Sequence, residues 1–141
     1  DWEMNHRIRE SGGKIWFTPD MVVTYRPRAN LRALASQYFG YGTWRREVAR
    51  RYRETISLRY LAAPALVLGV ALGLLIGLIG LVASQQLLVW VGAAPIVAYS
   101  LGVIMASLML RGSANRILLL VVFPVMHLSW GLGFLLGRAK S

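Results

Sequence analysis

Cysteine is absent from the 141-residue sequence, so neither a disulfide nor a thiolate takes part in its chemistry, and the redox compartment is left open. Acidic residues are scarce as well: there are six, and all of them precede residue 60. After Arg59 the only charged residues are Arg111, Arg116, Arg138 and Lys140. The chain is 56% hydrophobic and divides into a basic polar head and a nearly uncharged tail, which is not the composition of an ordinary soluble domain.

The head carries most of the formal net charge of +10, which indicates a surface for anionic lipid, nucleic acid or a phosphorylated ligand. The sequence begins without Met, and Asp1 falls inside a stretch with helical character. We therefore expect that the chain continues a longer protein whose remaining part lies upstream.

The tail contains three apolar runs, at about 60–83, 87–110 and 117–137, of which only the last contains an ionisable residue, His127. Each run reaches the roughly 20 residues needed to cross about 30 Å of hydrocarbon. Buried core helices are the alternative, but three such runs in succession leave too little amphipathic sequence to cover them. The connectors are short, so the tail predicts three transmembrane helices with antiparallel neighbours.

The basic residues predict the orientation of these spans. Arginines crowd the start of the first run, which places that end and the head in the cytoplasm, in a multi-pass protein of the cell membrane; they are Arg45, Arg46, Arg50, Arg51, Arg53 and Arg59. The third span would then carry Arg138 and Lys140 to the outside, which is the one exception to the positive-inside rule.

Small residues recur at four-residue spacing inside the apolar runs, at Gly69, Gly73 and Gly77 and again at Gly133 and Gly137. This spacing lets helix backbones approach closely. Packing among the three spans is favoured, and oligomerisation is the alternative. The intramembrane His127 raises a functional hypothesis, although a hydrogen bond between helices is the preferred role.

Residues 30–59 predict amphipathic helices that lie in the membrane interface. Asn30 is the expected N-cap, and two glycines, Gly40 and Gly42, are expected to break the helical pattern once. Aromatic and aliphatic residues recur at helical spacing on one face, and arginines occupy the other. Nucleic acid is excluded as a partner because no recognised module is present.

The first 29 residues predict a small α+β unit. A helix over residues 1–9 would end at Gly12 and Gly13, followed by short strands at 14–17 and 21–25 with a turn between them. From the residues alone this unit contains no metal cluster, no nucleophile with its base and no phosphate loop.

Several strings resemble a known family. In the head they are DWEMNHRIR at 1–9, GGKIWF at 12–17 with Pro19, YRPR at 25–28 and QYFGYGTWR at 37–45; in the third run they are HLSWGLGF at 127–134 with Gly137. Together they resemble the C-terminal part of membrane-anchored family 2 (GT-A) glycosyltransferases of the exopolysaccharide, succinoglycan-synthesis type.

The resemblance implies an enzyme that moves a sugar from a nucleotide-sugar donor to a glycan or lipid-linked acceptor by inversion. Asp1 would be its catalytic base, taking the proton from the attacking hydroxyl group. A divalent cation, Mg²⁺ or Mn²⁺, would hold the departing diphosphate, with ligands upstream and none in this chain. The donor site would also lie upstream, so this chain by itself is expected to be inactive.

Related processive synthases carry a Gln-x-x-Arg-Trp motif that contacts the acceptor. Gln37 occupies a comparable place, but Trp44 and Arg45 follow at a different spacing and in reverse order. The three residues are therefore candidates for acceptor or diphosphate binding, with membrane anchoring as the alternative for Trp44 and headgroup binding for Arg45.

The fold predicted is mostly α-helical. Residues 1–29 would be the end of a GT-A domain, 30–59 interfacial helices, 60–137 three transmembrane helices and 138–141 a tail. The partners expected are membrane lipid, donor and acceptor, with an oligomer as a further possibility. The alternative function is a non-enzymatic three-span protein whose basic head binds anionic lipid or a protein.

Overall fold

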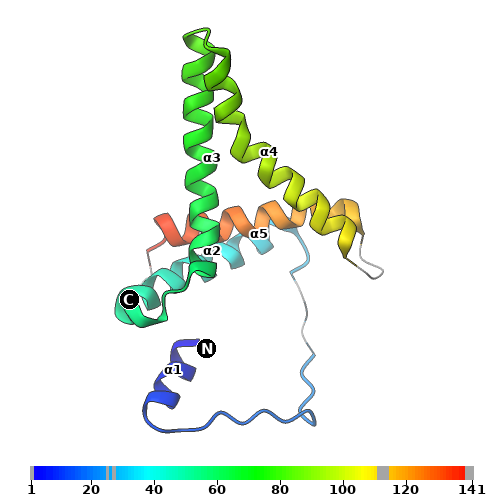
Figure 1. Ribbon diagram of the computed structural model, residues 1–141. Helices are drawn as coiled ribbons and strands as arrows, with labels where there is room; N and C mark the ends of the chain where they lie inside the picture. The colour runs from blue at the N-terminus through cyan, green and yellow to red at the C-terminus, as the bar shows by residue number, and fades with distance from the viewer. Residues whose placement is uncertain (1, 25, 27, 111–114, 139–141) are drawn as a thin grey trace.

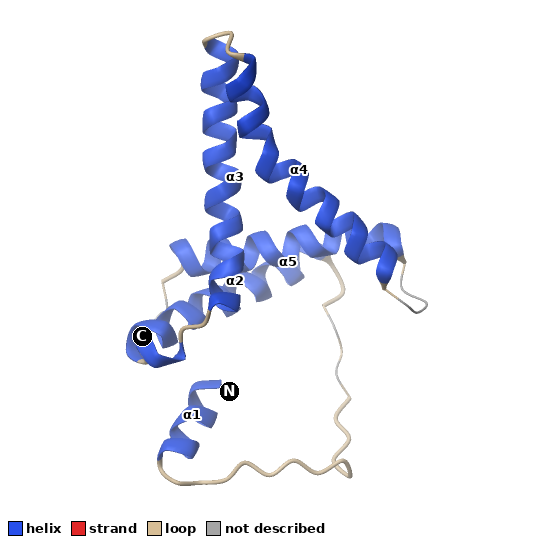
Figure 2. Cartoon of the chain, viewed as in Figure 1, coloured by secondary structure: helices blue, strands red, loops and turns tan. Residues whose placement is uncertain are grey.

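The computed structural model describes residues 2–24, 26, 28–110 and 115–138. This part of the chain forms five α-helices and one short 3₁₀ helix (Figures 1 and 2). They are α1 (Trp2–Glu10), α2 (Leu31–Arg51), η1 (Arg53–Thr55), α3 (Leu58–Val82), α4 (Gln86–Met109) and α5 (Arg116–Leu136). The predicted predominance of helix is confirmed.

The head contains the predicted first helix but no strand within its described residues. Gly12 ends α1 with a positive φ of 79°, a conformation that glycine adopts without strain. The strands predicted at 14–17 and 21–25 are wrong for their described residues, which have no regular structure. Trp16 and Val22 are each 89% exposed, so no sheet or helix covers them. Two short strands without such a partner are at best marginally stable in water.

Helix α2 begins where the sequence predicts. The Asn30 side chain accepts a hydrogen bond from the Ala33 backbone N–H at 2.8 Å. The predicted break at Gly40 and Gly42 is wrong, because α2 continues through both glycines to Arg51. Gly42 is buried against the backbone of α5, and this packing offsets the cost of glycine in a helix, which is about 1 kcal/mol.

Helices α3 and α4 form the predicted antiparallel hairpin, joined by a short turn in which Ser84 has a φ of 50°. Their backbones meet at glycines: a Cβ on Gly73 would lie 2.5 Å from the Gly92 carbonyl oxygen. A Cβ on Gly80 would lie 2.7 Å from the Val89 nitrogen. The close approach predicted for the glycines of the first run is confirmed for Gly73, and its partner is α4.

All three apolar runs form helices that are long and apolar enough to cross a membrane. They are 25, 24 and 21 residues long, and only 11% of the most apolar window of each is buried. Most of their apolar surface therefore points outward, which is the property expected of helices surrounded by lipid.

Helix α5 lies alongside α2 and across the beginning of α3 (Figure 1). It starts at an N-cap, because the Asn115 side chain accepts hydrogen bonds from the Ile117 and Leu118 backbone N–H groups at 3.0 and 3.3 Å. Gly133 faces the backbone of Phe39, and Gly137 faces Thr43, so α2 and α5 run in the same direction. The prediction that these two glycines pack among the spans is wrong, because their partner is α2.

Candidate functional site

The end of α5 is held by an arginine of α2. Arg46 donates two hydrogen bonds from one guanidinium nitrogen, to the Leu135 carbonyl at 3.0 Å and to the Gly137 carbonyl at 3.1 Å. These carbonyls lack partners within their own helix and carry the negative end of the helix dipole. A cation at this position is therefore stabilising, and the charge strengthens both hydrogen bonds.

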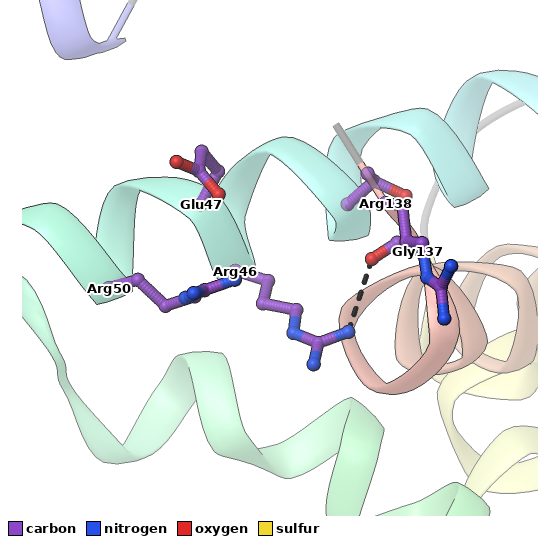
Figure 3. A pocket seen from close by; sticks show the side chains of 6 residues that line it. Arg46, Glu47, Arg50, Gly137 and Arg138 are labelled. Carbon is purple, nitrogen blue, oxygen red and sulfur yellow. Dashed lines mark hydrogen bonds between the residues drawn. The ribbon is translucent and has the colours of Figure 1, made fainter. Parts of the chain in front are cut away.

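A pocket of about 230 Å³ opens beside this contact (Figure 3). Its lining combines three arginines with one carboxylate and is made of Thr43, Arg46, Glu47, Arg50, Gly137 and Arg138. The carboxylate of Glu47 is already engaged, since it accepts a hydrogen bond from Arg51 at 3.0 Å. The pocket is thus cationic, and its guanidinium groups match the oxygens of a phosphate or carboxylate.

The sequence singled out Arg45 and did not single out its neighbour Arg46. In the structure, Arg45 does not line the pocket. Its guanidinium carbon lies 3.8 Å from the centre of the Tyr60 ring, and the group donates hydrogen bonds to the carbonyl and hydroxyl oxygens of Thr55. Burial lowers the pKa of Arg45; nearby Tyr60 acts in the opposite sense, and the positive charge of Arg59 lowers the pKa further. Arg45 connects α2 to the beginning of α3.

The other two candidates on α2 share one face, because Gln37 and Trp44 are seven residues, or two turns, apart. The Gln37 carbonyl oxygen accepts a hydrogen bond from Arg28 at 3.0 Å, and its amide donates to the Tyr41 hydroxyl. Trp44 is 60% exposed. Neither residue lines the cationic pocket, and Arg45 does not line it either, so all three candidates on α2 lie outside the arginine cluster.

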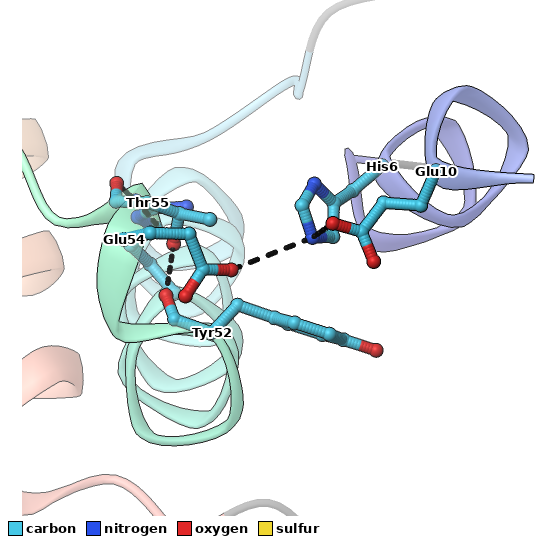
Figure 4. Close-up of polar contacts among 6 residues, drawn as sticks. His6, Glu10, Tyr52, Glu54 and Thr55 are labelled. Atoms are coloured by element: carbon cyan, nitrogen blue, oxygen red, sulfur yellow. Dashed lines mark hydrogen bonds and ion pairs between the residues drawn. The ribbon is translucent and has the colours of Figure 1, made fainter. Parts of the chain in front are cut away.

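Helix α1 is attached to the far end of α2 by His6 (Figure 4). The His6 Nε2 atom lies 3.6 Å from a carboxylate oxygen of Glu54 and 3.7 Å from one of Glu10. The imidazole also meets the Tyr52 ring edge-on, with 4.6 Å between ring centres. These contacts position the start of the chain, although the predicted base, Asp1, lies outside the described residues.

His127 bridges two of the apolar helices. Its Nδ1 atom lies 3.0 Å from the hydroxyl group of Tyr99 in α4, and its ring stacks on Phe123 with 6.1 Å between centres. The hydrogen bond between helices that the sequence predicts for His127 is confirmed. Among the described residues, no three His, Asp or Glu side chains gather where they could hold a metal ion.

The fold and the site define a helical membrane protein with a cationic surface built on α2 and the end of α5. Over 136 residues the chain is 36% identical to the succinoglycan biosynthesis protein ExoA of Rhizobium meliloti (strain 1021). The match covers 95% of this chain and 38% of the relative, so the chain spans well under half the length of the curated protein it matches. This similarity confirms the predicted relationship to proteins of succinoglycan synthesis.

No family model matches the chain. No solved structure matches it either.

Proposed function

We propose that this chain is the membrane part of a glycosyltransferase that acts in exopolysaccharide synthesis. The observation that carries the proposal is the 36% identity to a succinoglycan biosynthesis protein, which extends over 95% of the chain. The enzyme would transfer a sugar from a nucleotide-sugar donor to a glycan or lipid-linked acceptor, with inversion at the anomeric carbon. The head would work at the cytoplasmic face of the inner membrane.

In this proposal Asp1 is the general base that accepts the proton of the attacking acceptor hydroxyl. The His6 contacts with Glu54 and Tyr52 support this role, because they hold α1 against the end of α2, and Asp1 directly precedes α1. The chemistry would then take place close to the membrane surface, where a lipid-linked acceptor presents its hydroxyl group. Gln37 and Trp44 would contact that acceptor from their shared face of α2.

The departing nucleotide diphosphate requires positive charge in such a reaction. The described residues provide no group of metal ligands, so we assign the ligands of the expected Mg²⁺ or Mn²⁺ to the upstream part of the protein. This chain supplies arginines instead. Arg50 and Arg138, beside Arg46, form a pocket suited to phosphate oxygens on the donor or on a phosphorylated acceptor.

The test of the base is Asp1→Asn in the full-length protein, with Asp20→Asn as the matched control. Asp20 is also an acid of the head, but among the described residues its carboxylate accepts a hydrogen bond only from the nearby hydroxyl of Thr18, at 2.9 Å. We expect Asp1→Asn to lower transfer by about 10²–10⁴-fold, while membrane insertion and donor binding stay at the parent level. Asp20→Asn should transfer at the parent rate.

Near-normal turnover of the Asp1→Asn protein would reject the assignment of the base. The non-enzymatic alternative makes a different forecast: purified full-length protein would transfer no sugar from any nucleotide donor, yet would still bind anionic vesicles through its basic head.

A further inference from the structure

The position of α5 conflicts with three alternating membrane crossings. In such a bundle the end of α5 would lie level with the end of α3, near Val82. The structure instead places the last turns of α5 at the beginning of α3. A Cβ on Gly131 would lie 2.5 Å from the Ala63 carbonyl oxygen and 2.7 Å from a methyl carbon of Val67. Ala63 and Val82 are separated by about 28 Å of helix, roughly the thickness of the hydrocarbon core.

The contact with α2 supports the same position. α5 runs beside α2 in the same direction, and Arg46 of α2 donates to the carbonyls of Leu135 and Gly137 at its end. Helix α2 is far too charged to cross a bilayer, because it contains Arg32, Arg45, Arg46, Glu47, Arg50 and Arg51. A helix that follows α2 through its Phe39–Arg46 segment must therefore lie at the depth of α2.

The exposed side of α5 is suited to lipid acyl chains. Ile117, Val121, Leu132 and Leu136 fall on one face of the helix, away from the glycines that meet α2, and they are 77%, 46%, 38% and 68% exposed. α5 thus has an apolar exposed face on one side and packs against the charged helix α2 on the other side. Together α2 and α5 have the amphipathic cross-section of an interfacial structure.

We propose that α5 lies in the cytoplasmic interface beneath α2, so that only α3 and α4 cross the membrane. The partner of its exposed face is the acyl-chain layer of the inner leaflet. Because α4 starts beside the end of α3 and returns, both ends of α5 then lie on the side of the head. Arg116 and Arg138 join Arg59 in the cytoplasm, and the exception to the positive-inside rule disappears.

The two topologies differ in one measurable property, the side of the membrane on which the segment after α5 lies relative to the α3–α4 turn. Two crossings place them on opposite sides, and three crossings place them on the same side. This chain contains no cysteine, so once any cysteine of the upstream part has been replaced by serine, single cysteines can be introduced into the chain and labelled one at a time. Gln85→Cys marks the exposed turn, and Ser141→Cys marks the segment that follows α5.

The experiment labels each full-length variant in intact cells with a membrane-impermeant maleimide, before and after permeabilisation. We expect Gln85→Cys to react in intact cells and Ser141→Cys to react only after permeabilisation. Glu54→Cys, which is next to the start of α3, is the control for the cytoplasmic side and should behave like Ser141→Cys. Labelling of Gln85→Cys and Ser141→Cys from the same side, whichever side that is, overturns the proposal. The comparison is independent of sugar transfer, so an inactive enzyme would leave its outcome unchanged.

Discussion

The close contact between α2 and α5 can be tested at Gly133. A Cβ at this position would lie 2.8 Å from the carbonyl carbon of Phe39 and 2.9 Å from its Cα atom. Non-bonded carbon atoms prefer about 3.5–4.0 Å, so Gly133→Ala must push the two helices apart by roughly 0.6 Å or more. The obstructing atoms belong to the backbone and cannot turn away as a side chain could.

The size of the expected loss of stability follows from comparison with a glycine at which an added Cβ would touch no other residue. A Cβ on Gly69, in α3, would have no neighbour within 4 Å. Ala is favoured over Gly inside a helix by up to about 1 kcal/mol, and this gain applies to both positions. Overpacking costs about 1–3 kcal/mol and applies only at Gly133. We therefore expect the free energy of unfolding of Gly133→Ala to be about 1–3 kcal/mol below that of Gly69→Ala.

Chemical denaturation of the two purified variants in the same detergent, followed by tryptophan fluorescence, measures this difference. Trp130 lies in the α2–α5 contact, because its backbone carbonyl faces Gly42 of α2, so its fluorescence reports on this contact. Equal stability of the two variants would refute the reasoning, because it would mean that Gly133 has room for a methyl group and that α2 does not lie against it.

Two further substitutions test the polar part of this contact by the same measurement. Arg46→Gln removes two charge-assisted hydrogen bonds to the end of α5, so we expect it to lower the free energy of unfolding by about 1–3 kcal/mol. The control is Arg50→Gln, which changes an exposed side chain and should alter the free energy of unfolding by less than about 0.5 kcal/mol. Thr43 donates to the carbonyls of Phe39 and Gly133 at 3.0 and 3.3 Å, so Thr43→Val should cost about 1 kcal/mol and Thr43→Ser should restore most of it. A destabilisation by Arg50→Gln as large as that by Arg46→Gln, or a Thr43→Ser no better than Thr43→Val, would contradict these assignments.

The elements that the sequence predicted correctly depend on local chemistry. Asn30 caps α2 because its own side chain reaches the Ala33 N–H, and Gly12 ends α1 because glycine tolerates a positive φ. The three apolar helices follow from the length and composition of their runs. No knowledge of distant contacts is needed for any of these predictions.

The predictions from sequence are wrong where the local structure depends on packing against a segment that is distant in the sequence. Gly42 was predicted to weaken α2, but the backbone of Trp130, 88 positions further on, packs against it and the helix continues. The strands predicted near Trp16 and Val22 lack a partner among the described residues, so their β-propensity is not realised. The sequence alone does not distinguish Arg46 from its neighbour Arg45. Only the position of α5 shows that Arg46 donates hydrogen bonds to the end of that helix.

The site candidates show the same division. Asp1, Gln37, Trp44 and Arg45 were selected as candidates because the sequence resembles a glycosyltransferase family, and their proposed roles stay predictions. The arginine pocket could not be predicted, because Arg50 and Arg138 lie far apart in the sequence and meet only when α5 ends beside α2. The only sequence feature that pointed to this region was the four-residue spacing of Gly133 and Gly137. This spacing predicts a close contact between helices but does not identify the partner helix.

The sequence by itself determined that this protein enters a membrane, since three long uncharged runs in succession leave too little amphipathic sequence to bury them in a soluble core. It also determined which residues of the head are basic, and these residues are the basis for our proposal that the head lies on the cytoplasmic side. Only the tertiary structure decided what the third apolar helix does. The third run is apolar and long enough for a helix that crosses lipid, and the backbone contacts of Gly131 with α3 and of Gly133 with α2 are the reason why we propose that α5 lies along the membrane instead.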